Sequence, residues 1–148
     1  MDSVKTTPVV LQVGVKILLI NSEGKCLLLR RSLSKYPDIS GRFDIVGGRI
    51  EPGTGLLENL QREIKEETGL ELVGEPKLLA AQDIFRKANH HIVRLTYVGK
   101  SRGEVVLDTE ENDMYRWCTE KEFERVEDMD FYLKELSKKG VFEHVWRS

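Results

Sequence analysis

The chain has 148 residues, of which 40% are hydrophobic and 32% charged, the composition of a globular domain rather than of a disordered chain. This length fits one core, so we expect residues 1–148 to form a single domain. The formal net charge of -2 gives no basic field for long nucleic acid, and a small anionic ligand would need local cations.

Several classes of protein are excluded by simple patterns. No run approaches the roughly 18 apolar residues of a membrane span, and residues 1–5 lack the apolar core of a signal peptide. We therefore expect no membrane contact and a cytoplasmic location. Cys26 and Cys118 show no metal-binding spacing, which predicts two packed thiols rather than metal ligands or a disulfide.

In chain order, the first elements are strands. Residues 9–20 and 26–29 are rich in Val, Ile and Leu, and the turn residues between them predict a hairpin. Residues 32–41 are polar and include a proline, which predicts a loop. Residues 42–46 then form a predicted short strand that runs into a pair of glycines.

A helix is predicted over residues 55–68. Thr54 has a side chain typical of an N-cap, and Gly69 is a typical residue just past a helix end. The apolar residues at the spacing of a buried stripe are Leu57, Leu60 and Ile64.

The rest of the chain continues with strands and ends with helices. Residues 71–86, 92–98 and 114–118 are predicted strands, residues 100–113 a polar connection, and residues 120–139 one or two helices. Strands interleaved with few helices favour a mixed sheet covered on both faces, an α/β/α class of fold.

Three carboxylates share one face of the predicted helix. Glu63, Glu66 and Glu67 fall within about a 100° arc, because residues three and four apart are neighbours on a helix surface. Like charges at this spacing repel, and the last two lie where the helix dipole disfavours carboxylates. A hard divalent cation removes this conflict, because Mg²⁺ prefers oxygen ligands and commonly bridges carboxylates to substrate phosphates.

The alternative interpretation is an ordinary solvated face, supported by Lys65 and by the pairs that Arg62 can form with Glu58 and Glu66. The segment in front of the helix favours the metal site. Its glycine pair allows close backbone approach, so that a carbonyl oxygen and helix carboxylates can converge on one metal.

Residues 48–70 resemble the Nudix box, whose pattern is G-x5-E-x7-R-E-U-x-E-E-x-G-U, with U a bulky aliphatic residue. Eight of the nine specified positions match, and residues 27–31 and 111–117 also resemble family features. The resemblance implies a Nudix fold, a mixed α/β/α sandwich. It further implies hydrolysis of a nucleoside diphosphate linked to another moiety.

The departure from the pattern is Thr54, which stands where the family has its first glutamate. That glutamate is usually a supporting group near the arginine of the box and the metal. A weaker difference is Val46, where many members have proline. We expect tuned metal affinity rather than loss of activity.

The resemblance also implies roles for individual residues. Glu63, Glu66 and Glu67 are expected to bind Mg²⁺, with Mn²⁺ as the alternative ion, assisted by the carbonyl oxygen of Gly47. Arg62 is expected to orient the glutamates.

Water attacks phosphorus in this chemistry, and a carboxylate must take its proton. Glu63 could do so. Glu111 matches a glutamate that is an additional ligand or base in parts of the family, but a solvated acid in an acidic stretch explains it equally well.

Substrate contacts are less strongly indicated. Strand alternation sends Arg30 and Arg31 to opposite faces. The resemblance favours Arg31 as a phosphate contact, while exposed charges at a strand end explain the pair equally well. His90 begins a strand and could touch a base or phosphate, although such residues more often face solvent. Phe85 and Trp117 could stack on a base, although core packing is the commoner role.

Among Nudix proteins, the compact chain most resembles the MutT-type nucleoside triphosphate pyrophosphatases. The alternatives are hydrolases of ADP-ribose, nucleotide sugars or dinucleoside polyphosphates, and a non-catalytic module that binds a nucleotide. Arg86 and Lys87 stand where the ADP-ribose and diadenosine branches often have proline and tyrosine. The expected partner is a small nucleotide, and a homodimer stays open.

Overall fold

A computed structural model describes residues 8–147, which form a seven-stranded mixed sheet with helices. The strand order is β3-β2-β1-β6-β5, while β4 pairs with β1 and β7 with β2. The elements are β1 Val10–Ile20, β2 Cys26–Arg31, β3 Phe43–Asp44, β4 Val46–Arg49, α1 Leu56–Thr68, β5 Glu71–Lys87, β6 His90–Arg102, β7 Asn112–Cys118, α2 Glu120–Glu124, α3 Phe131–Lys138 and the 3-10 turn Val145–Arg147.

Strand β1 is the centre of the sheet. It runs parallel to β6 from Val10 to Ile20 and antiparallel to β4. Its predicted hairpin partner, β2, pairs with it at Ile20 and Cys26 and then turns to β3 and β7. The strands predicted over 9–20 and 26–29 are thus confirmed, but most of the pairing of β1 is with other strands.

The glycine pair lies inside a strand rather than after one. The predicted strand over 42–46 divides into β3 and β4, and Gly47 and Gly48 pair with Lys16 and Val15 of β1. A Cβ at Gly47 would lie 2.0 Å from the carbonyl oxygen of Val15, so only glycine permits this approach of β4 to β1.

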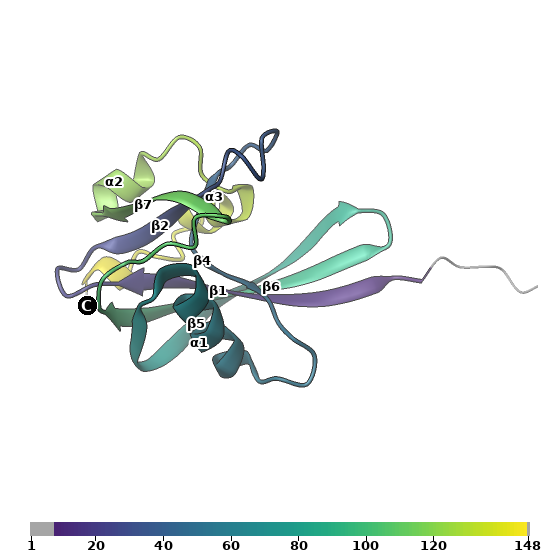
Figure 1. Ribbon diagram of the computed structural model, residues 1–148, viewed down its shortest axis with the longest axis horizontal. Coiled ribbons are helices and arrows are strands. Elements are labelled where there is room, and N and C mark those ends of the chain that lie inside the picture. Colours follow the sequence, from purple (N-terminus) through teal and green to yellow (C-terminus); the bar gives the residue numbers. More distant parts are fainter. Residues whose placement is uncertain (1–7, 148) are drawn as a thin grey trace, which may run out of the picture.

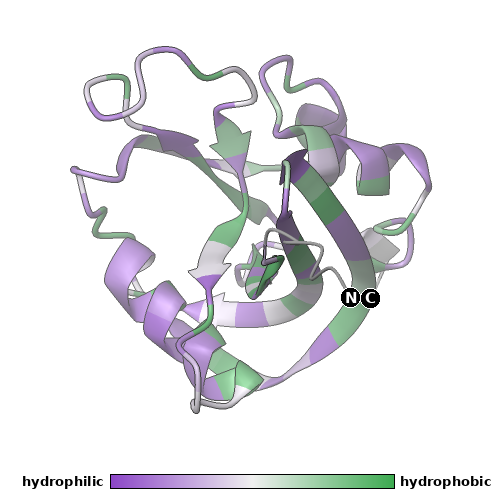
Figure 2. Ribbon diagram, turned by 90° about the vertical axis from the view of Figure 1, so that its right-hand side faces the viewer, coloured by the Kyte–Doolittle hydropathy of each residue, from purple (hydrophilic) through white to green (hydrophobic). Residues whose placement is uncertain are grey.

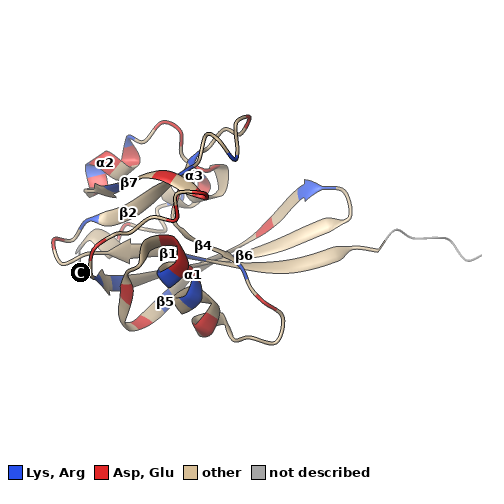
Figure 3. Ribbon diagram, in the orientation of Figure 1, with Lys and Arg blue, Asp and Glu red and all other residues tan. Residues whose placement is uncertain are grey.

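Strands β5 and β6 are longer than the sequence predicted. Antiparallel pairing continues from Ile84 and Ile92 to Glu71 and Arg102, so β6 includes the start of the predicted polar connection. Together with the first half of β1, these strands project from the body of the molecule (Figure 1). Figure 3 shows that this arm carries little charge except towards its tip.

Two hydrophobic cores lie on the two faces of the sheet. Leu60 and Ile64 of α1 pack on one face with Val15 and Ile17. Phe123 of α2 and residues of α3 pack on the other face with Cys26 and Cys118, which are buried and free as predicted. In the view of Figure 2 the sheet curls around apolar segments while the helices are largely hydrophilic. The predicted mixed sheet with helices on both faces is confirmed.

Helix α1 ends where the sequence predicted and begins one residue later, but two details were wrong. The N-cap is Gly55, which makes no side-chain cap, rather than Thr54. Leu57 is 44% exposed, and the buried positions of the helix include Asn59 instead. The buried amide satisfies backbone groups at the helix start, a function that apolar periodicity cannot reveal.

Both C-terminal helices form, and each begins with a side-chain cap. Thr119 caps α2 in a capping box, and Asp130 accepts hydrogen bonds from Tyr132 N and Leu133 N at the start of α3. Within residues 8–147, no helix has the length and apolarity that crossing a bilayer requires. Residues 1–5, where we expect no signal peptide, lie outside the described residues.

Candidate active site

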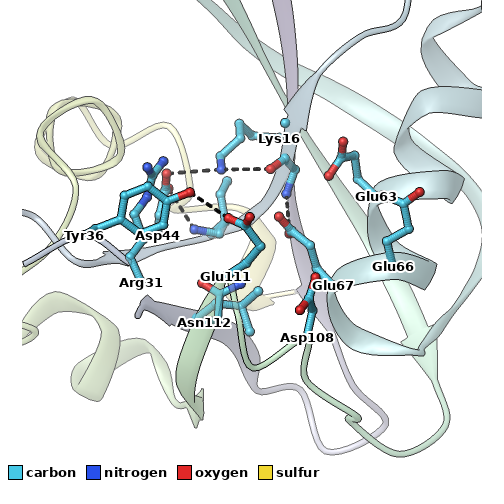
Figure 4. A pocket seen from close by; sticks show the side chains of 14 residues that line it. Lys16, Arg31, Tyr36, Asp44, Glu63, Glu66, Glu67, Asp108, Glu111 and Asn112 are labelled. Atoms are coloured by element: carbon cyan, nitrogen blue, oxygen red, sulfur yellow. Dashed lines mark hydrogen bonds and ion pairs between the residues drawn. The ribbon is translucent and has the colours of Figure 1, made fainter. Parts of the chain in front are cut away.

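A pocket of about 390 Å³ opens where α1 faces β4 and the segment before β7. Figure 4 shows the carboxylates of α1 on one side of it and Lys16, Asp44 and Glu111 on the other. Among the residues that the structure describes, its lining includes six carboxylates but only two basic side chains, Lys16 and Arg31. The acidic residues are Asp44, Glu63, Glu66, Glu67, Asp108 and Glu111. The pocket is therefore strongly anionic.

The glycine pair allows two of the carboxylates to reach the backbone of β4. The Gly47 N–H donates to Glu67 Oε2 at 3.1 Å. A Cβ on Gly48 would lie 2.8 Å from Glu63 Oε1, so the carboxylate of Glu63 occupies the space that a side chain would need. The sequence thus places Glu63 and Glu67 of α1 directly against β4.

Burial raises the pKa of both carboxylates. Glu67 is largely buried, and the loss of hydration raises its pKa to about 7, although the Lys16 ammonium and the Gly47 N–H oppose this rise. Burial also raises the pKa of Glu63, against the opposing charge of Arg62. Each group would keep its negative charge more readily if a cation lay beside it.

Glu66 stands at the rim of the same pocket. Its side chain is 59% exposed and lies 3.6 Å from Arg62, its neighbour one helical turn earlier. The three glutamates therefore share one face, as predicted, but Glu66 is far more hydrated than the other two.

Arg62 contacts several groups around the start of α1. Its guanidinium donates to Glu63 Oε1 at 3.1 Å and to Asn59 Oδ1 at 2.8 Å. Its Nε lies 3.6 Å from Glu51 Oε1. Arg62 thus contacts both the carboxylate of Glu63 and the turn before the helix.

Asn59 is a structural support that the sequence analysis missed. Its buried amide donates to the carbonyl oxygens of Thr54 and Gly55, at 3.0 and 2.7 Å, and accepts from the Glu51 N–H at 2.9 Å. It therefore fixes the turn before α1. An asparagine within the first turns of a helix could have indicated this role.

The oxygen groups around the glycine pair fit a hard divalent cation. The carboxylates of Glu63 and Glu67 and the carbonyl oxygen of Gly47 are donors of the type that Mg²⁺ prefers. Among residues 8–147 no three acidic, His or Cys side chains form a closed metal cage. This arrangement suits Mg²⁺, which usually takes one or two carboxylates and completes its shell with water and substrate phosphates.

Asp44, Arg94 and Lys16 form a buried ionic cluster beside the pocket, which the sequence analysis also missed. Arg94 contacts Asp44 at 2.9 Å and Asp130 at 3.3 Å, and Lys16 Nζ lies 3.2 Å from Asp44 Oδ2. Although burial alone would raise it, the two cations hold the pKa of Asp44 far below its usual range. A lysine within the apolar run of β1 was the available signal, because buried charges are almost always paired.

Glu111 lies in the pocket but is already engaged by the loop before β3. Its carboxylate accepts from Tyr36 Oη at 2.7 Å and from Lys35 Nζ. The hydrogen bond from Lys35, followed by that from Tyr36, lowers the pKa of Glu111. Glu111 is thus brought to the predicted site as an anion that anchors this loop.

The two arginines at the end of β2 point to different places, as alternation predicted. Arg31 lines the pocket, and its guanidinium lies 5.6 Å from the ring centroid of Tyr36. Arg30 pairs instead with Asp113 at 2.6 Å. A phosphate in the pocket would therefore meet Arg31.

Phe85 and His90 do not line this pocket. They line a separate hollow at the tip of the arm, together with His91 and Val9. His90 is held by Gln12 at 2.8 Å, and Phe85 is 67% exposed with its ring 4.5 Å from that of His91. Trp117 packs against the core on the α1 face, the role that the sequence favoured.

Comparison with known proteins identifies relatives of the whole fold. The sequence model of the NUDIX domain family matches residues 10–139. A CTP pyrophosphohydrolase of Escherichia coli K12 is 28% identical over 111 residues, which cover 74% of this chain and 78% of that protein.

Solved structures give the same result. The MutT protein of Methanosarcina mazei Go1 is 25% identical and has a TM-score of 0.73, with 96% of this chain and 97% of that chain covered. A MutT NUDIX hydrolase from Burkholderia pseudomallei, 21% identical, has the same fold at a TM-score of 0.73, covering 87% of this chain and 97% of that one. The resemblance found in the sequence and the predicted fold are both confirmed.

Proposed function

This chain belongs to the NUDIX domain family, and we propose that it is a Mg²⁺-dependent hydrolase of a diphosphate linkage in a nucleoside diphosphate joined to another moiety. Its relatives support a Nudix pyrophosphohydrolase, and enzymes of this family generally use divalent cations and small nucleotide substrates. The observation that carries the proposal is the placement of Glu63 and Glu67 against the backbone of Gly47 and Gly48, with Arg31 in the same pocket.

The proposed roles follow from these contacts. Mg²⁺ held by Glu63, Glu67 and the Gly47 carbonyl, with Glu66 at the rim, would neutralise charge that develops on the phosphate oxygens and activate water. Arg62 orients Glu63 through the hydrogen bond between them. Arg31 binds a phosphate oxygen of the substrate, because it is one of only two basic side chains among the described residues of the pocket lining.

The proton of the attacking water goes to a carboxylate, and Glu63 is the better acceptor of the two candidates. The carboxylate of Glu111 already accepts hydrogen bonds from Lys35 and Tyr36, whereas Glu63 lies against the glycine pair where the attacking water would be activated. We assign to Glu111 the role of anchoring the loop that carries Lys35 and Tyr36.

The preferred substrate class is a nucleoside triphosphate, cleaved as by MutT-type pyrophosphatases. The CTP pyrophosphohydrolase and MutT relatives favour this class. Hydrolysis of ADP-ribose, nucleotide sugars or dinucleoside polyphosphates is the alternative within the family. Binding of a nucleotide without cleavage is the alternative outside it.

A substrate panel tests the proposal. Nucleoside di- and triphosphates, nucleotide sugars and dinucleoside polyphosphates are incubated with the protein and Mg²⁺, and the products are separated by chromatography. We expect a nucleoside triphosphate to be hydrolysed to the nucleoside monophosphate and inorganic diphosphate. Glu67→Gln should lower kcat by orders of magnitude, whereas Glu58→Gln, an exposed change on the same helix, should not alter it.

Calorimetry distinguishes an enzyme from a binding module. A non-hydrolysable nucleotide is titrated into the protein with Mg²⁺, beside the panel. Binding of the nucleotide together with no turnover of any substrate would refute hydrolysis and leave the binding module. Near-normal rates for Glu67→Gln in saturating Mg²⁺ would refute the metal assignment.

A further inference from the structure

Lys16 is a charged side chain held inside the wall of the pocket. It lies at the middle of β1 between Val15 and Ile17, which are fully buried, and only 11% of its own side chain is exposed. It nevertheless lines the pocket, on the strand next to the glycine pair. Figure 4 shows its ammonium beside Asp44, and its hydrogen bond to the Gly47 carbonyl oxygen lies on the same wall of the pocket.

The ammonium of Lys16 has hydrogen-bonding capacity to spare. It carries three N–H donors. Nζ lies 3.2 Å from Asp44 Oδ2 as an ion pair, and one donor reaches the Gly47 carbonyl oxygen at 3.4 Å, close to the limit for a hydrogen bond. The ammonium therefore keeps donor capacity for an acceptor in the pocket.

Asp44 is not the counter-ion of Lys16 alone, because it also pairs with Arg94. Its carboxylate is shared with Arg94, which donates to both of its oxygens at 2.9 and 3.3 Å, and it also accepts from the Ile45 N–H. The charge of Lys16 therefore extends towards the pocket, where it favours the ionised forms of Glu63 and Glu67. The fold fixes this cation in place, so binding an anion through it costs little side-chain entropy.

We propose that Lys16 binds a phosphate oxygen of the ligand, so that β1 supplies a second cation of the chain to the phosphate site beside Arg31 of β2. A phosphate next to the Gly47 carbonyl lies beside the Lys16 ammonium. The inference rests on the proposed function only in requiring that the ligand carry phosphate. Lys16 contacts substrate in this assignment and is more than a partner for Asp44.

The test is calorimetric titration of the full chain with inorganic diphosphate and Mg²⁺, a probe with neither base nor sugar. Removing a charge-assisted hydrogen bond weakens binding by about 10- to 100-fold. We expect a loss of this size for Lys16→Met. Lys121→Met, a change at an exposed lysine of α2, should bind like the wild type.

A double variant separates the proposed contact from a structural role. If Lys16 only balances Asp44, then Lys16→Met together with Asp44→Asn should restore diphosphate binding, and that result would overturn the proposal. If Lys16 binds phosphate, binding stays weak in the double variant. Circular dichroism and thermal melting report the fold, and Lys16→Gln, a polar but uncharged replacement, is used in place of Lys16→Met if the latter does not fold.

The diphosphate titration tests the Lys16 contact separately from the proposed hydrolysis, because binding is measured without turnover. Lys16-dependent binding of diphosphate without hydrolysis of any substrate would refute the enzyme and support this contact. Unchanged binding in Lys16→Met, or no measurable binding by the wild type, would overturn the contact even if the protein proves to be an active hydrolase.

Discussion

Binding of Mg²⁺ should depend on pH through Glu67. Burial raises the pKa of this carboxyl to about 7, so below that pH the metal must displace a proton. For one group with this pKa, lowering the pH from 8 to 6 raises the apparent Kd for Mg²⁺ about tenfold. Near pH 7, binding should release about half a proton from this group.

Calorimetry in buffers with different ionisation enthalpies measures both quantities. The wild type is compared with Glu67→Gln, in which the pH dependence should become smaller and Mg²⁺ should bind more weakly at pH 8. Glu58→Gln, exposed on the same helix, should behave like the wild type. The reasoning fails if the Kd for Mg²⁺ is the same at pH 6 and 8, or if Glu67→Gln keeps the full dependence.

The raised pKa of Glu67 also predicts how stability depends on pH in the absence of metal. The free energy of unfolding should fall as the pH rises, whereas Mg²⁺ binding should become tighter. The folded pKa of about 7 for this carboxyl lies above the ordinary glutamate pKa of 4.5, so the folded state binds this proton more tightly. Its contribution to stability is therefore complete below about pH 4.5 and is lost as the pH rises through 7, for a total of about 3 kcal/mol. In EDTA at pH 8, urea unfolding should find Glu67→Gln more stable than the wild type, and a less stable variant would contradict the assignment.

Three further changes test the support of the site. Asn59→Ala removes a buried amide with several backbone partners and should lower the free energy of unfolding by about 3 kcal/mol in urea; a loss below about 1 kcal/mol would contradict this role. Gly48→Ala would place its Cβ 2.8 Å from a carboxylate oxygen of α1 and should weaken Mg²⁺ binding, whereas Gly14→Ala, whose Cβ has 3.7 Å to its nearest neighbour, should not; equal effects would argue against the placement. Arg94→Met leaves Asp44 with less compensation and should cost about 3 to 5 kcal/mol in thermal or urea unfolding, and a near-neutral change would show that Lys16 suffices.

The parts of the fold that sequence predicts well are those with local causes. Helix α1 appears within one residue of the prediction, because apolar spacing and the glycine after it are both local signals. Thr54 was misassigned because the helix begins after Gly55, and Leu57 because the polar Asn59, whose amide donates to the carbonyl oxygens of Thr54 and Gly55, is buried in its place. This choice depends on the turn at Glu51, which periodicity does not describe.

The site also combines residues that local sequence predicts with residues that it does not. Glu63, Glu66 and Glu67 are close in sequence, so one helical face brings them together before any tertiary structure is known. Lys16 and Asp44 are far apart in sequence and meet only because β3 pairs with β2 and β4 pairs with β1. Long-range strand pairing carries no local signature, and this is why the ionic cluster was not predicted.

The substitution at position 54 acquires a physical meaning from the contacts of Arg62. This arginine already reaches carboxylates of Glu51, Glu63 and Glu66, so a missing glutamate at position 54 does not leave it without a counter-charge. Its Nε is nevertheless a buried donor with no hydrogen bond among the described groups, since Glu51 at 3.6 Å is too far to accept one. The missing carboxylate at position 54 therefore affects how firmly Arg62 is oriented. It does not change the number of oxygen ligands around the glycine pair. We expect a change of that kind to alter metal affinity by degree, with the carboxylates of α1 left in place.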